Sequence, residues 1–290
     1  MDDFFRAEQH DNVNVDGGYV PGRCDQDALD ILKDSLGLLA RVAGTARNRP
    51  ETDTVDSVGA RCVLGLSILA IGEAQAALVL LSAGLDRPGR VHLRSLYEYG
   101  VRADLVSGDP QTAQRFLAAA AHEAKRLGTD MGLAPDRVQQ VIDAYTIPGV
   151  AAGREADALG GTMKAIVRAQ TDVAYYAMYF AWPSLMSHGS ILALHEVSRA
   201  IAGSGANFPA AAVTDGTGNA NLLQAAVAVH SLTFKLCKVF GIRHLAQELA
   251  NLIQRADAAR SRLFPNIPKR SETLGIEDPP DDAPYDEEGS

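Results

Sequence analysis

The segment that most constrains the fold is a long apolar run, Val63–Leu81, in a chain of 290 residues. A run of this length is compatible with a membrane span, but Glu73 and Gln75 stand at its centre, where an ionisable group in lipid is costly. A helix that is apolar on nearly every side belongs at the centre of a helical bundle. We therefore expect residues 54–83 to form a buried core helix, with no membrane span.

The segments on either side of this run show apolar residues at the spacing of an α-helix. Apolar residues from Leu29 to Val42 recur at steps of three and four, which places them on one face of a helix over 25–47. Period-two alternation is almost absent, so no sheet is expected. With Asp86 as a candidate N-cap and glycine or proline at the breaks, further helices are expected at 87–106, 110–127, 135–147, 162–180, 184–202, 219–240 and 242–263. The sequence predicts an all-α, single-domain bundle of eight or nine helices.

The net charge differs between the body of the chain and its two ends. Residues 1–24 are acidic and lack any period, so they are expected to be irregular. After Arg270 there are eight acidic residues and no basic one, which predicts a disordered acidic tail over 266–290. The net charge of −9 therefore comes from the ends, and the bundle domain, 25–265, is close to neutral. A basic nucleic-acid footprint and a DNA-binding motif are both absent.

The spacing of the cysteines and the lack of cofactor motifs limit the metal, redox and cofactor chemistry expected of the chain. Cys24, Cys62 and Cys237 lie far apart, which is typical of buried free thiols in a reducing compartment. The acidic N-terminus has no apolar core and is not a signal peptide, so a cytoplasmic location is expected. Neither an H-E-x-x-H motif nor a phosphate-binding P-loop occurs, and we expect no metal and no cofactor.

The first candidate constellation is Arg94 with Glu98, spaced i,i+4, which puts the guanidinium and the carboxylate on one helical face. His92, Tyr97 and Arg102 are close in sequence. An intrahelical surface ion pair is the simplest interpretation, and such a pair contributes little. The apolar and aromatic neighbours favour partial burial, which would need a structural or functional reason.

The second constellation is an aromatic segment that contains the chain's only tryptophan and leads into Ser184 and His188. The i,i+4 spacing places this hydroxyl and imidazole on one face, where they could form a nucleophile–base pair or a structural hydrogen bond. Without a G-x-S-x-G elbow, serine hydrolysis is not favoured. The catalytic candidates are thus His188, Arg94, Glu98 and Ser184. The candidate ligand-binding side chains are Tyr97, Tyr176, Tyr179 and Trp182.

The R-S-L-x-E motif at 94–98 and the S-x-x-x-H-G motif at 184–189 together resemble an uncharacterised family of bacterial all-helical proteins, a domain of unknown function. This resemblance covers about residues 55–200. It carries no established activity, and it implies that Arg94, Glu98, Ser184 and His188 meet in space.

More distantly, the chain is similar to HEPN-type helical ribonucleases of toxin–antitoxin and phage-defence systems. These cut RNA without a metal, through an R-x(4–6)-H motif near a dimer cleft. Arg87–His92 and Arg115–His122 fit that string, although Pro88 and Phe116 replace the polar residue usual after the arginine. The resemblance implies a homodimer and an RNA substrate.

Three functional classes remain open, and whether the chain is an enzyme is undecided. The first is a helical binding or regulatory protein with a small ligand, in a bacterial defence or stress module. The second is a metal-independent ribonuclease, with His188 as acid and base and Arg94 neutralising the scissile phosphate. The third is a dimeric scaffold without a pocket.

Overall fold

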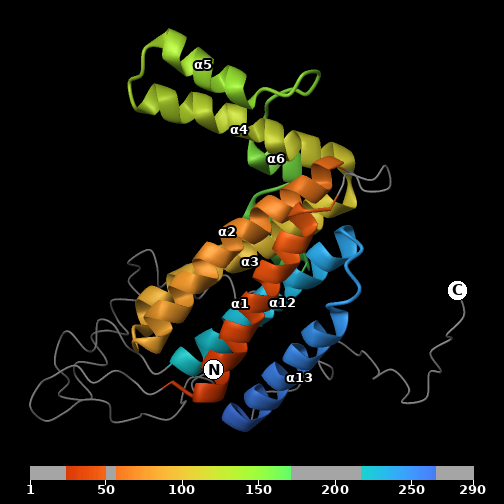
Figure 1. The fold of residues 1–290 in the computed structure, drawn as a ribbon. Helices are drawn as coiled ribbons and strands as arrows, with labels where there is room; N and C mark the ends of the chain where they lie inside the picture. Colours follow the sequence, from red (N-terminus) through yellow and green to blue (C-terminus); the bar gives the residue numbers. More distant parts are fainter. Residues whose placement is uncertain (1–23, 50–56, 171–216, 266–290) are drawn as a thin grey trace, which may run out of the picture.

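The structure is a computed structural model that describes residues 24–49, 57–170 and 217–265 of the chain. Every regular element within these ranges is an α-helix, so the all-α prediction is confirmed. Five long helices form the body of the bundle (Figure 1). They are α1 (Gln26–Arg47), α2 (Ser57–Ser82), α3 (Asp86–Gly108), α12 (Gly218–Val239) and α13 (Ala246–Leu263).

Helices α1 and α12 run parallel although they are far apart in sequence. At their N-terminal ends the Asp25 N–H donates a hydrogen bond to Asn219 Oδ1 across 2.8 Å. About three turns further along, Ser35 Oγ lies 2.7 Å from His230 Nε2. Helix α3 takes the same direction, because Lys235 Nζ contacts Asp104 Oδ2 at 2.7 Å near the C-terminal ends of α12 and α3. The N-termini of three parallel helices therefore meet at one end of the bundle.

Helices α2 and α13 run antiparallel to this group. Arg262, in the last turn of α13, contacts Asp25 Oδ2 at 2.8 Å at the start of α1. Near the other end, Arg41 of α1 forms an ion pair with Glu248 of α13. Side chains from all five helices fill the core, including fully buried Leu39, Leu81, Leu96 and Leu232 and nearly buried Leu252. This packing fixes which face of α3 remains accessible.

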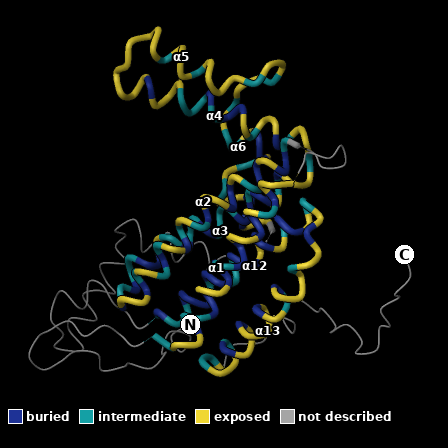
Figure 2. The backbone as a smooth tube through the Cα atoms, in the orientation of Figure 1, coloured by how far each residue is buried: buried dark blue, intermediate teal, exposed yellow. Residues whose placement is uncertain are grey.

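A helical hairpin projects from one end of the bundle (Figure 1). It consists of α4 (Pro110–Asp130) and α5 (Pro135–Tyr145), and Figure 2 shows it exposed along most of its outer part. The short helices α6 (Glu155–Leu159) and α7 (Met163–Gln170) bring the chain back towards the bundle. Buried Leu159, Ile166 and Val167 attach this return segment to the core.

The observed helix boundaries lie within a few residues of those predicted, with three corrections. Asp86 was expected to cap α3, but it is the first residue of the helix and is 4 % exposed, while Leu85 occupies the cap position. No helix was predicted between 147 and 162, yet α6 lies there. Helix α13 begins at Ala246 instead of 242, after turns at 241 and 244–245. Predicted helix 184–202 lies outside the described residues.

Two described helices, α2 and α12, are long and apolar enough by length and composition to cross a membrane. The same properties are expected of core helices, and both pack against the other bundle helices. Glu73, at the centre of α2, contacts His92 of α3 and is partly buried. The absence of a membrane span stays a prediction.

Candidate functional site

A charged network on α3 joins the bundle to the return segment. Arg94 Nε donates to Glu98 Oε1 across 2.9 Å, and Arg102 Nη1 donates to Glu98 Oε2 across 3.0 Å. Arg102 Nε also donates to Glu155 Oε1 of α6 across 2.6 Å. Residues 94, 98 and 102 follow one another at i,i+4, so one helical face presents all three groups. The predicted Arg94–Glu98 pair is confirmed, and it is part of a network that includes Arg102 and Glu155.

This network lies at the edge of the core. The side chains of Glu98 and Arg102 are 16 % exposed, whereas those of Arg94 and Glu155 are 30 % and 38 % exposed. Burial by itself would lower the pKa of the Arg102 guanidinium, but hydrogen bonds and charge from Glu155 and Glu98 outweigh it and raise that pKa. Arg102 therefore stays cationic, and Glu98 and Glu155 are its two acidic partners.

A histidine–glutamate pair joins α3 to α2. His92 Nδ1 is 2.6 Å from Glu73 Oε2 of α2, and both side chains are 28 % exposed. Tyr99 follows His92 by seven residues, about two helical turns. Burial and the nearby charge of Glu73 raise the pKa of the Tyr99 hydroxyl. A carboxylate that binds one imidazole nitrogen orients the ring and fixes its tautomer, an arrangement also found in general bases. Sequence reasoning named His92 but missed its link to Glu73.

In both R-x(4–6)-H strings the helical spacing separates the arginine from its histidine. Arg87 and His92 are five residues apart in α3, so their side chains leave the helix about 140° apart. Arg115 and His122 share a face of α4, but seven residues separate them by about 10 Å along the axis. Arg115 Nη2 lies instead 3.8 Å from Asp109 Oδ2.

The remaining predicted site residues divide into two groups. Tyr97 is half-buried and packs against the core beside the charged network. The others lie outside the described residues, so their proximity to Arg94 and Glu98 stays a prediction. They are Tyr176, Tyr179, Trp182, Ser184 and His188.

Buried polar side chains that sequence reasoning missed gather where the three parallel helices begin. Arg90 and Asp86 of α3 are 2 % and 4 % exposed. Arg90 Nη2 donates to Thr217 Oγ1, and Asn221 Nδ2 donates to the same oxygen across 2.9 Å. An alanine Cβ at Gly218 would lie 2.7 Å from Asp86 Oδ1. The i,i+4 spacing of Asp86 and Arg90 was the available sequence signal.

Cys24 borders this cluster and is a hydrogen-bond donor. Its Sγ donates to the Leu81 carbonyl oxygen across 3.1 Å. Burial, with the charges of Asp86 and Asp25, raises the pKa of this thiol to about 11. A thiol held protonated is a poor nucleophile, so Cys24 has a structural role. All three cysteines are free.

A histidine in the core was also missed. His230 is 5 % exposed, and burial lowers its pKa to about 4. Ser35 Oγ donates to the Ile31 carbonyl oxygen across 2.6 Å, so it accepts the hydrogen bond from His230 Nε2. The neutral imidazole thus joins α1 to α12 and is enclosed too deeply to meet a substrate. Its sequence signal was a single histidine directly after the apolar run 225–229.

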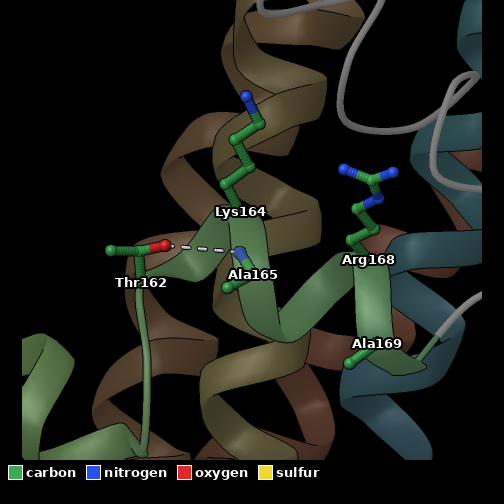
Figure 3. A pocket seen from close by; sticks show the side chains of 5 residues that line it. All are labelled: Thr162, Lys164, Ala165, Arg168 and Ala169. Carbon is green, nitrogen blue, oxygen red and sulfur yellow. Dashed lines mark hydrogen bonds between the residues drawn. The ribbon is translucent and has the colours of Figure 1, made fainter.

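A shallow hollow of about 380 Å³ lies on α7 (Figure 3). It is open to solvent, and the Ala165 N–H donates to Thr162 Oγ1 beside it across 3.3 Å. Lys164 and Arg168 stand one turn apart on its rim. Among the predicted site residues that the structure describes, Arg94, Tyr97 and Glu98 do not line this hollow.

No group of three or more potential metal ligands occurs among the described residues. Comparison of the chain with family models, curated proteins and solved structures finds no match. The resemblances noted above therefore depend on the sequence motifs alone.

Proposed function

We propose that this chain is a helical binding or regulatory protein, and that the charged network on α3 forms part of its recognition surface. The observation that carries the proposal is the charge balance of Arg94, Glu98, Arg102 and Glu155. Glu98 accepts one hydrogen bond from Arg94 and one from Arg102, and Glu155 accepts another from Arg102. Groups so connected hold α3 and α6 in a fixed arrangement and present a partly exposed polar surface.

The same charge balance argues against phosphoryl chemistry at this surface. A ribonuclease stabilises the negative charge that develops on the scissile phosphate, which requires excess positive charge at the site. Arg94 and Arg102 are the two basic groups of the described network, and Glu98 and Glu155 are its two acidic groups. An arriving phosphate would have to displace a carboxylate or bind beside it. Recognition of a neutral or mixed-charge ligand fits this electrostatic arrangement better.

Ser184 and His188, with Tyr176, Tyr179 and Trp182, are proposed to complete the recognition surface, as their motif resemblance implies. A cytoplasmic location and a role in a bacterial defence or stress module belong to the same proposal. No metal or cofactor is needed for recognition of this kind.

A ligand panel tests the binding role. The purified full chain is heated with single compounds from a set of nucleotides, amino acids and metabolic acids, and with a short single-stranded RNA. A ligand that binds the folded state raises the melting temperature. At a concentration one hundred times its dissociation constant it raises the free energy of unfolding by about 2.7 kcal/mol. We expect at least one compound to raise it, and Arg94→Ala to abolish that rise. Arg126→Ala, which removes an exposed arginine from an ion pair on α4, is the matched control and should retain the rise.

Ribonuclease activity is the second candidate, favoured by the Glu73–His92 pair. The Glu73 carboxylate orients an imidazole that is partly open to solvent, as a general base requires. Cleavage of a labelled RNA in the presence of a chelator, lost in His92→Ala or His188→Ala but not in His244→Ala, would establish this candidate and contradict the binding-only role. His244 is an exposed histidine outside the helices.

A further inference from the structure

Two cations flank the hollow on α7. Lys164 and Arg168 stand on its rim, and in Figure 3 both side chains extend to the same side of the helix. Neither forms an ion pair with an acidic residue that the structure describes. The nearest acidic residues along the chain are Asp157 and Asp172. Within the described residues, the positive charge at the hollow is therefore uncompensated, whereas each arginine of the α3 network has an acidic partner.

The positions of these two cations weaken α7. Lys164 and Arg168 are spaced i,i+4, and like charges at this spacing repel one another along a helix face. Lys164 is also the second residue of α7, and the first turn contains no acidic residue. A helix N-terminus carries a partial positive charge, which disfavours a cation there. An anion bound between the two side chains would convert both repulsions into attractions.

The hollow has room for a small ligand. Its volume of about 380 Å³ is at the lower end of the range for small-molecule sites. The other described residues that line it are small and uncharged, namely Thr162, Ala165 and Ala169. Beneath them, Ile166 and Val167 are 8 % and 0 % exposed and hold α7 against the core. The two cations therefore stand on a helix that the core holds in place.

The first turn of α7 adds backbone donors to the two cations. Thr162 Oγ1 accepts the Ala165 N–H across 3.3 Å, and the Thr162 carbonyl oxygen accepts the Ile166 N–H across 3.0 Å. The N–H groups before these have no acceptor within the helix, as at any helix N-terminus. N–H groups so placed favour phosphate and other anions. Their contribution adds to that of the two side chains on the rim.

We propose that the α7 hollow binds the phosphoryl group of a small ligand. The Arg168 guanidinium can donate two parallel hydrogen bonds to phosphate oxygens, and Lys164 supplies a point charge. A phosphate monoester carries a charge of about −1.5 to −2 at neutral pH, which balances two cations, whereas one carboxylate balances only one. The inference does not depend on the proposed role of the α3 network, whose own carboxylates disfavour a phosphate.

Glycerol phosphate is the probe, and glycerol is its matched control without the phosphoryl group. Binding to the full chain is measured in phosphate-free buffer, by the melting temperature and by amide shifts in ¹⁵N NMR. We expect glycerol phosphate to raise the melting temperature and to shift the amides of 163–165, and glycerol to do neither. Inorganic phosphate that binds as tightly would identify free phosphate as the ligand, and weaker binding would identify a phosphate ester.

Single substitutions on the rim test the role of each cation. Lys164→Gln and Arg168→Gln should each weaken glycerol phosphate binding by at least about tenfold, because each removes a charge-assisted hydrogen bond. Both side chains are exposed, so the melting temperature without ligand should change little. Lys125→Gln and Arg137→Gln are the matched controls, since these exposed cations of α4 and α5 do not line the hollow. Both controls should bind like the wild type.

Three results would overturn the proposal. They are a wild type that binds no glycerol phosphate up to about 10 mM, equal binding of glycerol and glycerol phosphate, and unchanged binding when Lys164 and Arg168 are both replaced by glutamine. Arg94→Ala should retain glycerol phosphate binding, and its loss there alone would move the site to the α3 network. A chain without phosphate binding that still binds a panel compound through Arg94 would leave the proposed function standing.

Discussion

Replacing Glu98 with alanine tests the charged network on α3. The carboxylate accepts one hydrogen bond from Arg94 at 2.9 Å and one from Arg102 at 3.0 Å, and the side chain is 16 % exposed. Exposed ion pairs contribute roughly 0.2–1 kcal/mol, whereas breaking a buried pair costs about 3–5 kcal/mol. After the change Arg102 still contacts Glu155, and the half-exposed Arg94 can be hydrated. We therefore expect a loss of about 2 kcal/mol.

Thermal and urea unfolding of the full chain measure this loss. For a domain of this size, about 2 kcal/mol corresponds to a fall in melting temperature of about 4–8 °C. Glu123→Ala is the matched control, because Glu123 pairs with Arg126 on α4 and is 45 % exposed. It should cost under about 0.5 kcal/mol. A Glu98→Ala loss equal to that of Glu123→Ala would refute the stabilising network, and a loss above about 4 kcal/mol would show that Glu155 does not compensate Arg102.

Three further predictions concern other parts of the chain. His230 has a pKa of about 4 in the folded protein against an ordinary 6.5, so the stability present above pH 6.5 should fall as the pH drops towards 4, by about 3 kcal/mol at most. Urea unfolding across this range should show a smaller fall for His230→Leu, and His244→Gln should behave as the wild type. Gly218→Ala should lower the melting temperature because its Cβ would lie 2.7 Å from a buried carboxylate, whereas Gly44→Ala, with no atom within 4 Å, should leave it unchanged or raise it. Deleting 271–290 should leave the melting temperature unchanged, and a clear fall would show that the acidic tail binds the body.

The helices were predictable because each carries a local signal. The α1 boundary is an example: Asp25 accepts a hydrogen bond from the Ala28 N–H, as a capping aspartate should. Asp86 occupies a similar place in sequence but enters the helix, where it packs against Gly218. That contact comes from a helix more than a hundred residues later. A local pattern cannot distinguish a capping carboxylate from one that tertiary packing buries.

The same distinction between local spacing and tertiary packing applies to the candidate site. Arg94 and Glu98 were predictable because their spacing fixes a shared face. Glu155 was not, because Arg102 reaches it across 53 residues and α6, which holds Glu155, was not among the predicted helices. The His92–Glu73 pair likewise depends on the register of α2 against α3, which neither helix specifies alone. Intrahelical contacts follow from spacing, while contacts between helices require the packing.

The parallel pairing of α1 with α12 has a consequence for synthesis. Ser35 and His230 are separated by 195 residues, so the first helix meets its partner only after most of the chain has been translated. At roughly 5–20 residues per second this delay is about 10–40 s. During that interval the α1 face that α12 later buries is uncovered on the ribosome. A nascent chain of this kind is a substrate for chaperones that hold apolar segments, and a fragment ending before α12 should aggregate instead of forming a smaller stable domain.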